Sequence, residues 1–138
     1  MCALPGTTSL NCGNIVFVMQ GYFYATAGAG TYTISTGSNI DNALYFWAGA
    51  DAYADYTNSN WAYAAVRAGS GPYTSGAVTL TLQEYEMVPV TVMWVNGGGI
   101  GAAFLTVTMP NGVVHTDGFW LPADDGSACP GLMSPFVP

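Results

Sequence analysis

The chain consists largely of short runs of β-branched and aromatic residues separated by turn sequences, and no long stretch has the period of a helix. The alternation in 77–82 is typical of a strand with one apolar face. Gly28-Ala29-Gly30 and Pro110-Asn111-Gly112 supply turns, and 50–63 favours at most a single helical turn. The expected strands are 14–25, 31–35, 43–47, 63–67, 77–82, 88–95, 103–109 and 113–115. Short strands joined by turns predict an all-β fold, an antiparallel sandwich or barrel.

Charge limits the possible partners of this fold. Only 7% of the residues are charged, against about 25% in ordinary soluble domains. The net charge is −7, and Arg67 is the only cation, so neither nucleic acid nor an anionic membrane surface is expected as a partner. No apolar run reaches the ~20 residues that span a bilayer. We expect one domain over 1–138, with a Gly- and Pro-rich tail from about residue 124.

The three cysteines, Cys2, Cys12 and Cys129, lie near the two ends of the chain. Such placement is typical of a secreted domain that ties its termini together. We predict a disulfide between Cys12 and Cys129, because Cys12 directly precedes the first strand; Cys2 is the alternative partner. The odd number leaves one thiol free or paired with another chain. No Cys-x-x-Cys spacing for zinc occurs.

Two polar loops adjoin apolar strands and are the candidate binding positions. Asn39-Ile40-Asp41-Asn42 precedes the run 43–47, and Asn96 with three glycines follows the run 88–95. Glycines let a ligand approach main-chain carbonyls closely. The simpler interpretations are an Asx turn at Asp41-Asn42 and a type I′ hairpin at Asn96-Gly97. The hairpin does not explain Gly98 and Gly99, so a ligand loop is the second interpretation there.

Five segments together resemble the PA14-like lectin domains of fungal cell-surface adhesins, and the GLEYA branch in particular. The resemblance covers 14–117. The most specific stretch is Trp-Val-Asn-Gly-Gly-Gly, residues 94–99. The segments are Gln20–Ala25, Gly30–Ile34, Ile40–Gly49, Pro89–Gly98 and Val107–Gly112.

The resemblance implies a β-sandwich that holds a sugar through bound Ca²⁺. In such domains two adjacent aspartates joined by a cis peptide form the first calcium loop, and they fall here on Asp41 and Asn42. The second loop contributes the Asn96 side chain and carbonyls of about Gly98 and Ile100. Calcium takes six to eight oxygen ligands, so sugar hydroxyls can fill open positions. Asn at position 42 removes one carboxylate, which predicts a lower calcium affinity.

The remaining candidates are weaker. Trp61 is either a core residue or a ring that stacks on a sugar, and Gly97 would line the ligand site. His115 is expected on an edge strand, and Asp51 and Asp55 on the surface. No nucleophile elbow, paired carboxylates or phosphate loop is identifiable, so we do not expect an enzyme. The core is expected to contain Phe17, Trp47, Val92 and Trp94.

The predicted function is therefore that of a secreted or cell-wall adhesin domain, a calcium-dependent lectin for cell-surface glycans. The alternative is a structural extracellular module with a degenerate sugar site that assembles with its own copies into oligomers or filaments. Three observations favour this alternative. Few surface charges keep copies apart, and the odd cysteine offers a crosslink between chains. The short stretch before the first strand would leave a sheet edge open to a strand from a neighbour.

Overall fold

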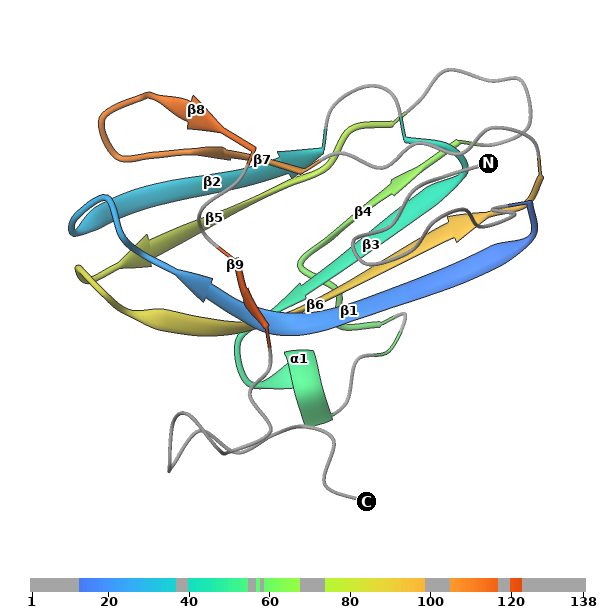
Figure 1. Cartoon of the computed structure of the whole chain (residues 1–138), viewed down its shortest axis with the longest axis horizontal. Helices are drawn as coiled ribbons and strands as arrows, with labels where there is room; N and C mark the ends of the chain where they lie inside the picture. Colours follow the sequence, from blue (N-terminus) through green and yellow to red (C-terminus); the bar gives the residue numbers. More distant parts are fainter. Residues whose placement is uncertain are drawn as a thin grey trace.

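The computed structural model describes residues 13–36, 40–54, 57, 59–67, 74–98, 105–116 and 120–122. These residues form two antiparallel sheets with one short helical turn, α1 (Asp51–Ala54), as Figure 1 shows. The first sheet has the strand order β4-β3-β6-β1-β9, and the second has the order β5-β2-β7-β8. The strands are β1 (Ile15–Tyr24), β2 (Gly30–Thr36), β3 (Ala43–Ala48), β4 (Tyr63–Val66), β5 (Ala77–Leu82), β6 (Met87–Asn96), β7 (Leu105–Thr108), β8 (Val114–His115) and β9 (Trp120–Pro122). The predicted antiparallel sandwich is confirmed.

The register of the five-stranded sheet places the two polar loops at one end of it. β6 lies between β1 and β3, with Ile15 opposite Asn96 and Ala43 opposite Val95. Because β3 and β6 are antiparallel, the residues before β3 lie beside the residues that end β6. This end of the sheet is on the right in Figure 1.

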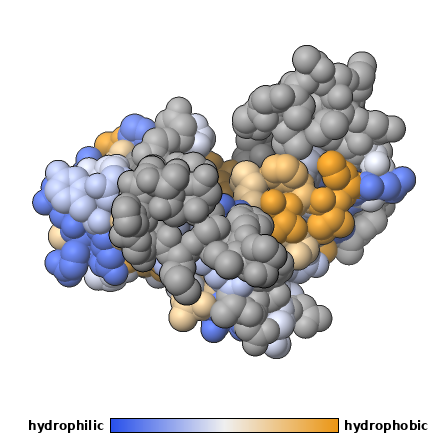
Figure 2. All heavy atoms as spheres, turned by 60° about the horizontal axis from the view of Figure 1, so that its bottom comes forward, coloured by the Kyte–Doolittle hydropathy of each residue, from blue (hydrophilic) through white to orange (hydrophobic). Residues whose placement is uncertain are grey.

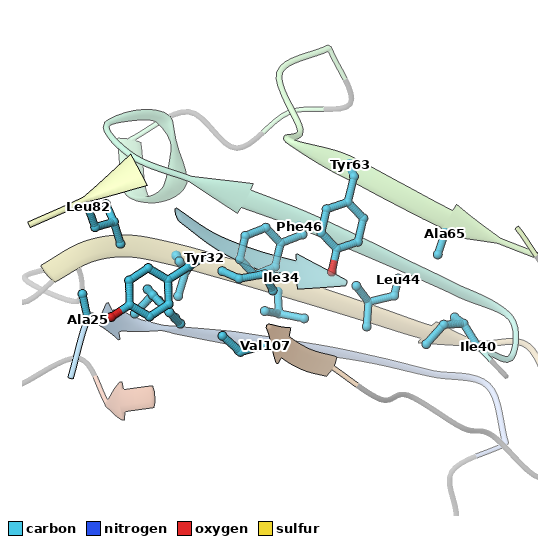
Figure 3. Close-up of a cluster of buried hydrophobic side chains, with 13 residues drawn as sticks. Ala25, Tyr32, Ile34, Ile40, Leu44, Phe46, Tyr63, Ala65, Leu82 and Val107 are labelled. Carbon is cyan, nitrogen blue, oxygen red and sulfur yellow. The ribbon is translucent and has the colours of Figure 1, made fainter. Parts of the chain in front are cut away.

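The core lies between the two sheets and is built from alternate positions on each strand. Phe46 stacks on Tyr63 with ring centroids 5.2 Å apart and an angle of 6° between the rings. Phe23 meets Tyr32 edge to face at 5.4 Å. Figure 3 shows the Tyr63 ring beside Phe46 with its hydroxyl directed into the cluster. Gly76 is required against this ring, because a Cβ there would lie 2.3 Å from Tyr63 Cδ2.

The turn α1 packs on the outer face of the five-stranded sheet. Thr91 on β6 is fully buried, and its hydroxyl donates to the carbonyl of Ala52 and accepts from Gln20 Nε2 at 3.1 Å. Tyr53 of α1 donates its hydroxyl to the Gly21 carbonyl at 2.5 Å. The hydroxyls of Thr91 and Tyr53 thus both have hydrogen-bond partners within the protein. Within the described residues, no helix is long and apolar enough to cross a membrane.

The structure corrects parts of the predicted core. Trp94 and Val92 are buried on the inward positions of β6, as predicted. Trp47 is also buried, but it faces outward and is covered by the loop before β4, where Thr57 O and Asn60 Oδ1 accept from its Nε1. Phe17 is only partly buried, so the prediction of a core Phe17 was wrong. It lies in the first half of β1, where the side chains are exposed or only partly buried, whereas Phe23 in the second half is buried.

The predicted strands otherwise match, with one omission. His115 lies on the edge strand β8, as predicted, and α1 is the single helical turn expected in 50–63. β9 was not predicted, because it is only three residues long and contains a proline. It pairs with β1 at Gly21–Phe23.

Candidate cation and glycan site

The two predicted loops meet in the structure through main-chain and side-chain hydrogen bonds. Asn42 N donates to Val95 O at 2.9 Å, and Gly97 N donates to Asn42 Oδ1 at 2.5 Å. The Asp41–Asn42 peptide bond is cis. The sheet register brings the first loop to the second, so the proximity of Asn42 and Gly97 is a direct consequence of β3–β6 pairing.

Among the described residues, Asp41 carries the only carboxylate in the cluster that it forms with Asn42 and Asn96, and its two oxygens differ. Oδ2 accepts from Arg67 Nη1 at 3.0 Å, with the side chains 18% and 27% exposed, respectively. Oδ1 is buried and has no hydrogen-bond partner among the described residues. The main-chain carbonyl of Asp41 accepts from Trp94 Nε1 at 2.9 Å. Since buried oxygens are normally satisfied, an unpartnered carboxylate oxygen is expected where a ligand completes the site.

Asn96 extends the inward positions of β6 beyond Trp94 and is buried, with 1% of its surface exposed. Gly98 N lies 3.4 Å from Asn96 Oδ1, a long hydrogen bond. Gly98 has φ of 137°, which favours glycine. A Cβ at Gly97 would lie 3.4 Å from Asn42 Oδ1, which is an ordinary van der Waals contact. The glycine requirement of the second loop therefore comes from the backbone conformation of Gly98.

The donor atoms fit a hard cation in type but supply little charge. Asp41, Asn42 and Asn96 offer carboxylate and amide oxygens, which Ca²⁺ prefers. The single carboxylate is balanced by the Arg67 guanidinium. Within the described residues, no group of three or more His, Cys, Asp or Glu side chains is placed to hold a metal. The set therefore fits a hard cation in the type of its oxygens but offers it little negative charge.

Trp61 lies apart from this cluster. It is 39% exposed, and its ring centroid is 5.3 Å from that of Tyr45, which in turn stacks on Trp47 at 6.1 Å. Trp61 precedes Tyr63, which pairs with Phe46 near the far end of β3 from Asn42. The structure therefore places Trp61 on an aromatic platform on the outer face of the sheet, and not with Asp41.

Several other predicted positions lie outside the described residues, namely Ile100, Asp55, Cys12 and Cys129. The predicted carbonyl ligand at 100 and the disulfide therefore stay predictions. Asp51 is exposed on α1, on the outer face of the sheet, as expected of a surface residue.

Sequence reasoning missed two residues of the cluster, Arg67 and Trp94. Arg67 N donates to Asn42 O at 2.7 Å, so β4 pairing fixes the position of its side chain next to the first loop. The signal was available, because the only cation of the chain ends a predicted strand. The hydrogen bond from Trp94 to Asp41 had no such signal, since buried tryptophans usually indicate only packing.

Comparison with known families shows to which of them the chain belongs. The GLEYA domain model matches residues 15–109, most of the chain. The chain belongs to the GLEYA domain family. The sequence prediction of this family is confirmed.

Two kinds of relative support the assignment of this GLEYA domain. A Schizosaccharomyces pombe protein named for cell agglutination is 30% identical over 97 residues, which are 69% of this chain and 8% of that protein. The epithelial adhesin 6 A domain of Candida glabrata, solved with Galβ1-3GlcNAc, matches with a TM-score of 0.68 and 22% identity. That match covers 91% of this chain and 58% of the adhesin chain.

The epithelial adhesin 9 A domain of Candida glabrata, solved with Galβ1-4GlcNAc, matches with a TM-score of 0.64 and 17% identity, over 86% of this chain and 57% of that chain. These similarities show a shared fold. The GLEYA domain spans little more than half of the solved adhesin domains and a small part of the Schizosaccharomyces pombe protein.

Proposed function

We propose that this GLEYA domain is a carbohydrate-binding domain of a fungal cell-surface adhesin that binds its glycan with the help of Ca²⁺. The observation that carries the proposal is the buried Asp41 Oδ1, which has no hydrogen-bond partner among the described residues, at the end of the sheet where Asn42 meets the second loop. The family assignment and the glycan complexes of the solved structures support it. An extracellular location, at the cell surface or in the cell wall, is part of the same proposal.

In this proposal the side-chain oxygens of Asp41, Asn42 and Asn96 hold the ion, together with main-chain carbonyls of Gly98 and Ile100. Calcium would supply open coordination positions for two neighbouring sugar hydroxyls. The protein's own part is to hold these oxygens in place. Trp94 and Arg67 anchor Asp41, and Gly97 N fixes Asn42 Oδ1.

The experiment is calcium titration by isothermal calorimetry, followed by glycan binding with and without EDTA. The glycan panel begins with the disaccharides Galβ1-3GlcNAc, Galβ1-4GlcNAc and lactose. Asp41→Ala is expected to abolish both calcium heat and glycan binding. Asp51→Ala is the matched control, since it removes an exposed carboxylate on α1 and is expected to change neither. No heat at millimolar Ca²⁺ in the unmodified domain would overturn the calcium part.

Trp61 would act at a distance from the ion. Its exposed ring beside Tyr45 offers a flat apolar surface to a further sugar of a longer glycan. Trp61→Ala is therefore expected to weaken binding of longer oligosaccharides and to leave calcium affinity unchanged. Equal losses for a disaccharide and a longer glycan would contradict this role.

A second candidate function, assembly with copies of the same chain, is favoured by the apolar surface of β1. Val16 is 60% exposed, Val18 42% and Met19 48%. Figure 2 shows hydrophobic atoms gathered in a patch on the face below the five-stranded sheet. Within the described residues, β9 pairs with β1 only at Gly21–Phe23, so the first part of β1 has one edge without a described partner.

Light scattering separates the two functions. A monodisperse monomer with glycan affinity would end the assembly proposal. Large species that persist in EDTA and ignore every glycan would end the lectin proposal. Val18→Lys is expected to reduce assembly if β1 is the interface, because a charge would have to be buried there.

A further inference from the structure

Arg67 occupies a position that bears directly on the charge of the proposed ion site. It is the only cation among 138 residues, and its guanidinium contacts Asp41 Oδ2 at 3.0 Å. Asp41 is also the only carboxylate that the structure brings to this cluster, because Asn42 and Asn96 are neutral. A single salt bridge therefore balances the whole formal charge of the site.

The position of Arg67 is fixed by the fold. Its main-chain N donates to Asn42 O at 2.7 Å, immediately after Val66 pairs with Ala43. The guanidinium thus reaches Asp41 from the strand next to β3. Both side chains are less than one third exposed, so solvent screens their interaction only partly. Oδ2 is thus held by Arg67, whereas Oδ1 has no hydrogen-bond partner among the described residues.

We infer that Arg67 sets the calcium affinity of this domain, holding it low by neutralising the carboxylate that would bind the ion. This inference rests on the proposed function. A divalent cation bound to Asp41 Oδ1 shares its carboxylate with a fixed positive charge and is repelled by it. The guanidinium also keeps Asp41 ordered without metal. The domain therefore keeps its first loop in place at low calcium and loads the ion only where calcium is abundant.

Two substitutions of Arg67 separate the effect of its charge from that of its shape. Arg67→Gln removes the charge and keeps a polar side chain, so it is expected to tighten calcium binding by about tenfold, as one fewer repelling charge near a divalent ion allows. Arg67→Lys keeps the charge and is expected to keep the low affinity. Thr79→Glu is the matched control, because it makes the same change in net charge at an exposed position on β5, in the other sheet.

Two measurements on the whole domain test the inference: the calcium dissociation constant by calorimetry, and the melting temperature with and without Ca²⁺. Without calcium, Arg67→Gln is expected to melt lower, because Asp41 loses its partner. With calcium, its melting temperature is expected to rise more than that of the unmodified domain, as tighter binding to the native state requires.

The outcomes separate the inference from the function on which it rests. If neither the unmodified domain nor Arg67→Gln binds calcium, the calcium part of the proposed function fails, and the inference with it. If the unmodified domain binds calcium and Arg67→Gln binds it with equal or lower affinity, the inference alone is overturned. Equal melting shifts with calcium in both proteins would mean that Arg67 is only structural. An equal gain in calcium affinity in Thr79→Glu would show a general effect of net charge and would also overturn the inference.

Discussion

Two buried polar clusters lie along β6. The α1 cluster surrounds Thr91 beneath α1, and the loop cluster consists of Asp41, Asn42 and Asn96 at the end of the strand. They differ in whether their hydrogen-bonding groups all have partners within the described residues. In the cluster beneath α1, the Thr91 hydroxyl donates to Ala52 O and accepts from Gln20. In the cluster at the end of β6, Asn96 is equally buried, yet Asp41 Oδ1 has no hydrogen-bond partner among the residues that the structure describes. The first cluster is complete without a ligand, whereas the second is not.

The difference shows how one strand serves both stability and binding. A buried polar group that is fully hydrogen-bonded contributes to a unique packing, and its loss is costly. A buried oxygen left without a partner costs free energy in the free protein and recovers it when a ligand binds. Substitutions in the α1 cluster should therefore change stability and leave binding alone, whereas substitutions in the loop cluster should change binding strongly and stability only modestly.

Asp41→Asn is expected to have the largest effect. It keeps the shape of the side chain and removes its charge, so calcium affinity should fall by about a hundredfold or more, because ligand charge largely determines such affinities. The comparison predicts only a modest change in melting temperature, from loss of a partly exposed ion pair. Calorimetry and thermal unfolding on the same sample check both parts. A collapse of stability with calcium affinity intact would reverse the assignment of the two clusters.

Thr91→Val tests the other cluster. It removes the hydroxyl that bridges Gln20 and Ala52. The Gln20 amide and the Ala52 carbonyl would then each lose a buried hydrogen bond. The free energy of unfolding should fall by about 2 kcal/mol, which lowers the melting temperature of a domain of this size by about 6 °C. Chemical denaturation measures the first quantity. Calcium and glycan affinities are expected to stay unchanged, and a parallel loss of binding would show that the clusters are coupled.

The alternating strands and the turns between them made the sandwich predictable from the sequence. Period-two patterns indicate which face of a strand is buried, as at 77–82. They can be recognised in a single sequence without knowing which strands pair. The three-residue β9 carries no such pattern. The exposure of Phe17 depends on how far the second sheet extends over β1, which no local pattern encodes.

The part of the candidate site that lies at the ends of strands was predictable from the sequence. Asp41, Asn42 and Asn96 flank apolar strands, and the antiparallel pairing of β3 and β6 joins them. The Arg67–Asp41 pair depends on the β4 register, and the separation of Trp61 from Asp41 depends on where β4 begins. Both are properties of strand pairing across the sheet, so residue types and local spacing did not reveal them.

Asn42→Asp sharpens the comparison by adding charge to the incomplete cluster. The new carboxylate can still accept from Gly97 N, which now contacts Asn42 Oδ1. Calcium affinity should rise by about tenfold, since the site gains a negative charge next to the ion. The calcium dissociation constant is the measurement, with Asp51→Asn as a control for charge changes elsewhere. An unchanged constant would indicate that Asn42 is a turn residue and does not face the ion.

Tyr63→Phe has the smallest expected effect and asks whether every unpartnered buried oxygen marks a binding site. Within the described part of the chain the buried Tyr63 hydroxyl has no hydrogen-bond partner, and burial raises the pKa of this phenol, so it is neutral at physiological pH. It lies in the apolar core beside Phe46 (Figure 3), away from the oxygens of the loop cluster. Removing it should raise the free energy of unfolding by about 1 kcal/mol, because an unsatisfied group is replaced by an apolar one of nearly the same shape. Denaturant unfolding checks this gain, and calcium and glycan binding should stay the same. Weaker binding in Tyr63→Phe would show that the core hydroxyl supports the site as well, and the contrast between the two unpartnered oxygens would then be lost.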